Sequence, residues 1–195
     1  MINTMNERWK SSLKFSLTIA VITFVLAAIF SSMSSTILSK VGWVSGLMIV
    51  FIIVIIGIIF DMLGIASTAV KESPLHAMAA EKVIGAREAV IIHKNADKFA
   101  SFCNDVIGDI SGIVSGSALT IVIIEISQIM NGANDPSWQI ILSIILTSIV
   151  AAVTVGGKAI GKYFAINAAV NILLFTGKII YFIQTKLKIK LLPNK

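Results

Sequence analysis

The residues of this chain best suited to chemistry are acids that stand within long apolar segments, where a charge is costly and usually has a function. They are Asp61, Asp105, Asp109 and Glu125. Carboxylate oxygens suit hard cations such as magnesium, sodium or calcium. The three aspartates are therefore candidate cation ligands, and Ser67 and Gly157 are expected along the same route. Glu125 is either an entry acid or an interfacial residue, and we favour the interfacial interpretation.

Small residues repeat every fourth position beside two of these acids. The repeat consists of Gly108, Gly112 and Gly116, with Ser111 and Ser115 next to it. Such rows let helix backbones approach closely. Asp105 and Asp109 have the same spacing and fall roughly on the glycine side, so we expect shelter from lipid. Two interpretations remain open: helix packing, within a monomer or across a dimer, with the acids neutralised, or a cation route.

Four apolar segments must position these residues, each at least about as long as the 20 residues that a helix needs to cross a bilayer. They cover 15–38, 43–66, 99–130 and 138–157. Hydrophobic residues make up 56% of the chain and charged residues 13%. The segments lack the alternation of a barrel, so the sequence predicts an all-α integral membrane protein with four transmembrane helices.

The basic residues predict the topology. With four crossings, every Lys and Arg except Lys40 lies on one side of the membrane. The positive-inside rule makes that side the cytoplasm, which predicts a multi-pass cell-membrane protein with both termini cytoplasmic. The net charge of +6 then orients the chain and attracts anionic lipid headgroups. A nucleic-acid partner is not expected, because no basic soluble domain is present.

The remaining segments are assigned from polarity and turn residues. Residues 1–14 are the cytoplasmic N-terminus, and 15–38 form an extra helix before a transmembrane core at 43–157. That first helix could be a signal peptide, but a retained anchor is favoured. The polar interval 71–98 predicts two short cytoplasmic helices, the first capped by Ser73. Residues 158–195 predict an interfacial amphipathic helix with a basic tail, because a fifth crossing would carry lysines outward.

Catalytic signatures are missing from the sequence. His76 and His93 lack zinc-protease spacing, and Cys103 is the only cysteine. No catalytic Ser or Cys has a recognisable paired base, and no phosphate-binding glycine loop occurs. The chain is therefore not expected to be an enzyme.

Three segments resemble the membrane domain of the cyclin M (CNNM), CorB and CorC magnesium transporters. Residues 64–70, Gly-Ile-Ala-Ser-Thr-Ala-Val, resemble the serine-rich end of that family's first core helix. Residues 107–119, with Ile-Gly-Asp at the start and Ser-Ala-Leu at the end, resemble its second core helix. Residues 157–162, Gly-Lys-Ala-Ile-Gly-Lys, are similar to its Gly-Glu-x-x-Pro-Lys string. The resemblance implies a homodimer with a cytosol-facing magnesium site.

The chain departs from this family at several positions. Lys158 replaces the acid of the third string, Gly161 its proline, and Ile113 an asparagine of the second helix. The family's regulatory nucleotide-binding domains do not follow before Lys195. We expect the Lys158 ammonium to stand where the family holds its metal, as a tethered cation paired with one of the three aspartates. The alternative is that Lys158 only extends to the headgroups.

These observations predict a divergent transporter or exchanger for a hard cation, magnesium first. The alternative is a transport-inactive scaffold or regulatory subunit, which uses the glycine row to form a dimer or to bind a larger transporter. Both interpretations have the lipid bilayer and a second copy of the chain as partners, and a larger transporter is a partner in the second interpretation alone. Magnesium is expected as cargo, and no other cofactor is expected.

Overall fold

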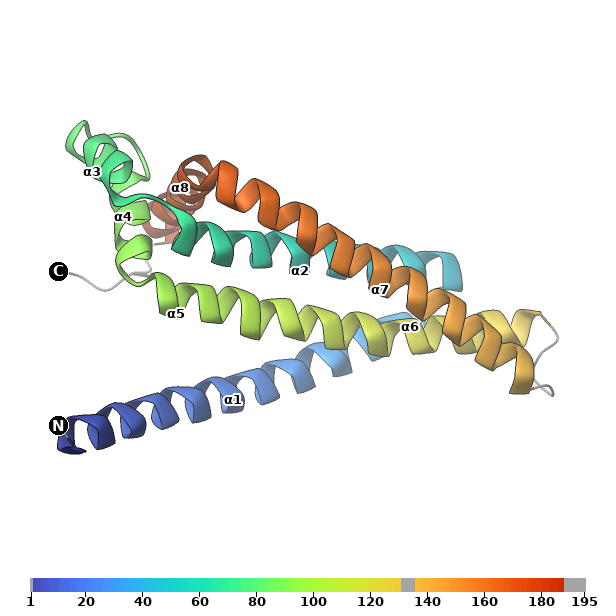
Figure 1. Ribbon diagram of the computed structural model, residues 1–195. Helices are drawn as coiled ribbons and strands as arrows, with labels where there is room; N and C mark the ends of the chain where they lie inside the picture. The colour runs from blue at the N-terminus through green and yellow to red at the C-terminus, as the bar shows by residue number, and fades with distance from the viewer. Residues whose placement is uncertain (1, 131–135, 188–195) are drawn as a thin grey trace. The chain divides into compact units, whose positions relative to one another are not determined.

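The computed structural model describes residues 2–130 and 136–187, and that part of the chain is all-helical (Figure 1). The long helices are α1 (Ile2–Leu38), α2 (Trp43–Ala69), α6 (Asp109–Ile129), α7 (Pro136–Asn167) and α8 (Ala169–Leu187). Between α2 and α6 lie α3 (Glu72–Ala80), α4 (Ala86–Lys94), α5 (Ala96–Ser101) and the π-helix η1 (Phe102–Gly108). The predicted all-α fold class is confirmed.

Within residues 2–130 and 136–187, four helical segments are long and apolar enough to cross a membrane. They are Ser12–Leu38, Trp43–Ala69, Ala96–Ile129 and Ser137–Asn167. Large apolar side chains are exposed along them, for example Leu17 at 69% and Phe24 at 75% on α1. Such a continuous apolar surface is rare on a water-soluble monomer. The helices therefore have the composition of lipid-facing elements.

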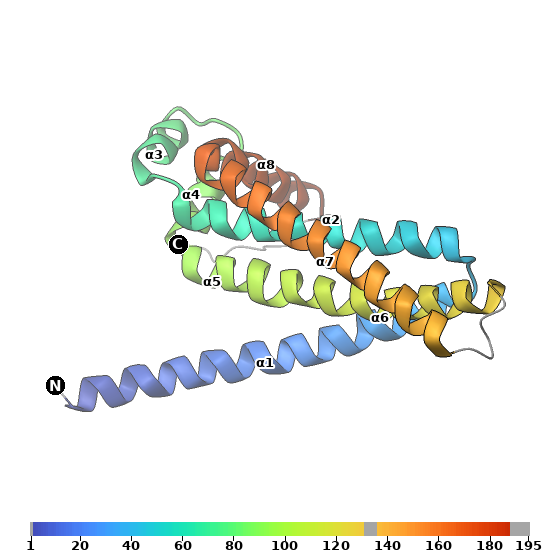
Figure 2. The same cartoon turned by 45° about the vertical axis from the view of Figure 1, so that its right-hand side comes forward.

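The described residues divide into two compact units. The first comprises the described parts of Met1–Val54 and Asp109–Ala152. Within it α1 packs against α6, which Figure 2 shows. A Cβ at Gly46, near the start of α2, would lie 2.7 Å from Val122 Cγ2 of α6, so glycine is needed for this approach. Glu125 lies near the α1–α2 turn, where a Cβ at Gly42 would be 3.9 Å from its Oε1.

The second unit comprises the described parts of Ile55–Gly108 and Val153–Lys195. Within it α3 and α4 form a hairpin that packs on α8 (Figure 1). The buried cluster beneath the hairpin contains Val70, Leu75, Ala89, Ile92, Ala169 and Leu173. Gly85 precedes α4 in the left-handed conformation, with φ of 84°. Two short helices were predicted here, and two are present.

The contact between α4 and α8 depends on glycine at position 177. A Cβ there would collide with the Gly85 carbonyl group and lie 3.0 Å from the Ala89 nitrogen. We expect Gly177→Ala to lower the free energy of unfolding by about 1–3 kcal/mol, because backbone cannot yield as a side chain can. Gly156→Ala is the matched control, since a Cβ at that helical glycine meets nothing within 4 Å. Denaturation in detergent micelles measures both. Equal stability of the two variants would contradict this account.

Two boundaries differ from those predicted. The fourth apolar helix, α7, does not end at Gly157 but continues to Asn167, and only Ala168 separates it from α8. Glycine is a poor helix former but does not end a helix that packing supports. Helix α3 begins at Glu72 after Lys71, so Ser73 lies inside the first turn rather than at the cap. Residues 188–195 of the predicted basic tail lie outside the described residues.

Candidate functional site

An acid from one membrane-length helix and a lysine from another meet in the second unit. Lys158 Nζ of α7 lies 3.8 Å from Asp61 Oδ1 of α2. The exposed fraction is 31% for the Lys158 side chain and 16% for that of Asp61. Asp61 is one of the three partners that the sequence left open for Lys158. The pair neutralises two charges that would each be costly inside apolar helices.

Glycine lets α7 approach α2 closely enough for this pair to form. A Cβ at Gly157 would collide with the Ile58 side chain of α2, approaching its Cγ1 to 3.3 Å. One turn later, a Cβ at Gly161 would lie 3.5 Å from Ile58 Cγ2 and 3.7 Å from Met62 Cβ. Gly157, predicted along a cation route, therefore acts as a packing residue that positions its neighbour Lys158.

The π-helix η1 lies beside the pair. A Cβ at Gly108 would be 3.8 Å from Lys158 Nζ, 3.9 Å from Asp61 Oδ1 and 3.4 Å from the carbonyl oxygen of Cys103. These are close to ordinary van der Waals distances, so Gly108 leaves room for about one methyl group next to the charges. Single π-helical turns within α-helices occur frequently at functional sites.

A second polar group faces α2 one turn along η1. The Asn104 amide lies against Gly64, where a Cβ would come within 2.7 Å of its Cγ. Asn104 Oδ1 is buried and accepts no hydrogen bond from the described residues. Such an unsatisfied oxygen is costly, and a cation or water would relieve the cost. Gly64 and Asn104 were not predicted as site residues, although an amide within an apolar segment is itself a signal.

Ser67 is fully buried near the end of α2, and its hydroxyl donates a 2.7 Å hydrogen bond to the Gly64 carbonyl. His93 Nδ1 of α4 lies 3.2 Å from the Ser67 carbonyl oxygen. The serine hydrogen bond lies within α2, whereas the histidine contact joins the end of α2 to α4. Ser67 therefore contributes to the site by hydrogen bonding to the helical turn that contains Gly64.

The other predicted residues differ in their surroundings, and the ion pair of Lys158 is with Asp61. Asp105 and Asp109 are exposed on the chain rather than sheltered, and Asp109 belongs to the first unit. Gly108 is buried beside the pair, whereas a Cβ at Gly112 or Gly116 would meet nothing within 4 Å. The π-helical winding before α6 changes the phase of the helix, so a four-residue spacing does not keep these residues on one face.

Over 2–130 and 136–187, no group of three or more His, Cys, Asp and Glu side chains could hold a metal ion. Asp61 is thus paired with a lysine rather than with further acids.

The chain matches no family model, no curated protein and no solved structure.

The chemistry of the site is therefore inferred from its geometry alone. The site consists of the Asp61–Lys158 ion pair, the unsatisfied Asn104 amide oxygen and the π-helix η1. An ammonium group held beside a carboxylate can do two things. It can neutralise the acid permanently, or it can leave when another cation takes its place.

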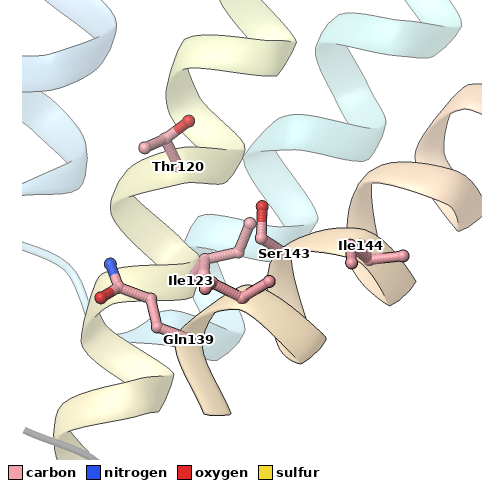
Figure 3. Close-up of a pocket in the computed structure, with 6 residues that line it drawn as sticks. Thr120, Ile123, Gln139, Ser143 and Ile144 are labelled. Atoms are coloured by element: carbon pink, nitrogen blue, oxygen red, sulfur yellow. The ribbon is translucent and has the colours of Figure 1, made fainter. Parts of the chain in front are cut away.

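The first unit has a separate groove between α6 and α7, with a volume of about 280 Å³ (Figure 3). It is lined by Thr120, Ile123, Gln139, Ile140, Ser143 and Ile144. The Thr120 hydroxyl donates to the Gly116 carbonyl at 3.1 Å, so the groove adjoins the open glycine positions. Its lining combines three isoleucines with Thr120, Gln139 and Ser143 and includes no acid or base, which suits helix contact rather than an ion site.

Proposed function

We propose that this chain is a multi-pass membrane protein, with cytoplasmic termini, that transports or exchanges a hard cation at the Asp61–Lys158 pair. The observation that carries the proposal is the pair itself, formed between two helices of membrane-spanning length. Ionisable residues at such positions mark ion pathways more often than they mark packing. With the crossings bounded as the sequence predicts, at 15–38, 43–66, 99–130 and 138–157, fifteen of the sixteen basic residues fall on one side, which supports insertion with that side cytoplasmic.

In the proposed mechanism Lys158 is a tethered cation. In the resting state its ammonium neutralises Asp61, and the substrate cation replaces it at the carboxylate. The Lys158 side chain is 31% exposed and has a flexible stem, so its charge can withdraw towards headgroups when it is displaced. Exchange of one cation for another keeps the carboxylate paired throughout. This avoids the cost of an isolated charge in an apolar environment.

The oxygens at hand suit magnesium as the first cargo to test. The Asp61 carboxylate is a hard ligand, and the buried Asn104 Oδ1 lacks a partner among the described residues. Magnesium keeps several of its waters and is commonly held by one or two carboxylates, so a complete protein cage is not required. A resident magnesium is disfavoured while Lys158 remains beside Asp61, because the positive charges repel each other.

Membership of the cyclin M, CorB and CorC family is part of the same proposal. Each of its three resembling segments supplies a residue to the site. Gly64 faces Asn104, Gly108 adjoins the ion pair, and the third segment contains Lys158 itself. Segments that resemble a family and also meet in space support the resemblance beyond their separate sequences.

A scaffold is the second candidate function, and the open space at Gly112 and Gly116 favours it. Small residues whose added Cβ would meet no described residue within 4 Å can accept a helix of a second copy or of a larger transporter. The adjacent groove adds Gln139 and Ser143 as hydrogen-bonding groups. This interpretation requires assembly but no ion movement.

Ion flux separates the two functions. We expect proteoliposomes containing the parent protein to take up magnesium, reported by an enclosed magnesium-sensitive dye. Asp61→Asn should reduce the rate at least about tenfold, the effect of about 1.4 kcal/mol on a barrier. Asp105→Asn is the matched control, because it removes an exposed acid from η1. Chemical cross-linking of the same preparations reports dimers. Dimers without flux in the parent would favour the scaffold, and equal flux in both variants would contradict a role for Asp61.

A further inference from the structure

The second unit contains an apolar pocket that the proposed cation site does not use. It lies among α2, α5, η1 and α8 and has a volume of about 520 Å³, within the range of ligand sites. Its walls include Ile59, Leu63, Phe102, Cys103, Ile172 and Phe175. Thr176 also lines it, but its hydroxyl already donates to the Ile172 carbonyl at 2.9 Å. The pocket therefore suits an apolar occupant rather than water.

The pocket has a defined depth if the protein spans a membrane, and the inference rests on that part of the proposed function. Ile59 and Leu63 belong to the last turns of the Trp43–Ala69 span, and Phe102 to the first turns of the Ala96–Ile129 span. Both ends adjoin the α3–α4 hairpin along the chain. This places the pocket at the edge of the hydrocarbon layer, where acyl chains are the abundant apolar molecules.

A lysine accompanies each of two pocket walls. Lys98 precedes Phe102 by four residues, and Lys178 follows Phe175 by three, so each lysine shares a helix face with a lining aromatic. All four side chains are exposed. Two lysines one helical turn from lining aromatics give the pocket's helices a positive charge that complements a molecule with an apolar chain and an anionic head. Basic pockets beside membrane helices bind anionic lipid headgroups in this way.

We propose that the pocket binds one anionic phospholipid, with an acyl chain between α2 and α8 and its phosphate at Lys98 and Lys178. The lipid would contact the π-helix η1, which contains Gly108 beside the ion pair. The Cys103 side chain lines the pocket, while its carbonyl oxygen lies 3.4 Å from the Cβ position of Gly108. Lipid binding would thus act on η1 beside Asp61 and Lys158.

Native mass spectrometry of the detergent-solubilised full chain tests this proposal with phosphatidylglycerol and phosphatidylcholine of identical acyl chains. We expect one phosphatidylglycerol per chain, bound at least about tenfold more tightly than phosphatidylcholine, equivalent to about 1.4 kcal/mol. Lys98→Gln with Lys178→Gln should abolish that preference. Lys162→Gln is the matched control, because Lys162 is an exposed lysine on α7 and away from the pocket helices.

Two further arms distinguish chain binding from headgroup binding. Leu63→Trp and Ile172→Trp each fill the pocket and should weaken binding of both lipids, with thermal unfolding showing that each variant is folded. Inorganic phosphate should not compete with the lipid. Equal phosphatidylglycerol binding by the parent and the double lysine variant would overturn the proposal, as would full competition by inorganic phosphate. The lipid-binding experiment uses no cation gradient and is therefore independent of ion transport. Failure to bind lipid would not contradict the proposed transport, and failure to transport magnesium would not contradict lipid binding.

Discussion

Replacing Lys158 with Glu is expected to tighten magnesium binding at least about tenfold, or about 1.4 kcal/mol. The substitution removes a positive charge 3.8 Å from Asp61 Oδ1 and puts a carboxylate near its place. Two unit charges about 4 Å apart interact by about 4 kcal/mol at an effective dielectric of 20, so tenfold is a lower bound. Calorimetry on the purified protein in detergent measures the affinity.

The control for this variant is Lys162→Glu, which makes the same change in net charge one turn further along α7. Lys162 is exposed and forms no ion pair with a described residue. A general increase in negative charge would tighten magnesium binding equally in both variants. That outcome would contradict the tethered-cation account, because the gain would then owe nothing to the position beside Asp61.

Asp61→Asn and Lys158→Met should each destabilise the protein, and the double variant should lose less than the sum of the two single losses. Either single change leaves one charge unpaired between apolar helices, which costs about 1–3 kcal/mol. The double variant contains neither charge, so it does not incur the cost of an unpaired charge. The exposed fractions of 16% and 31% mean that solvent weakens the pair, so a coupling energy of about 1 kcal/mol is expected.

Equilibrium unfolding in mixed micelles, applied as a double-mutant cycle, gives this coupling energy directly. A second cycle with Asp61→Asn and Lys162→Met provides the control, since Lys162 lies one turn from Lys158. We expect no coupling in the control cycle. Additive losses in the first cycle would mean that Asp61 and Lys158 do not interact in solution.

The sequence predicted the helical elements well because their signals are local. Apolar length alone identifies the four candidate membrane helices, and Gly85 marks the break between α3 and α4. The fourth apolar segment was predicted to end at Gly157 because lysines and asparagines follow it. The structure shows that this glycine packs against Ile58, a contact between helices that no local pattern contains.

The site itself was only partly predictable. Lys158 was predicted to form an ion pair because it replaces an acid of the family's third string. The sequence left three aspartates as candidate partners, because helix packing decides which of them Lys158 contacts. The π-helix η1 has no recognisable sequence signature here. It changes the number of residues per turn, whereas the prediction from the glycine spacing assumed a continuous α-helix. Asp105 and Asp109 consequently lie exposed, while the half-buried Asn104 places its buried Oδ1 against Gly64.

The most direct test of the account is whether a cation displaces Lys158 from Asp61. The rate at which an amine-reactive ester modifies Lys158 can be measured by mass spectrometry across a magnesium titration, with Lys162 as the internal reference. The account predicts a saturable rise in Lys158 modification, and a constant rate at Lys162. An unchanged rate at Lys158, over concentrations at which magnesium is bound or transported, would contradict it.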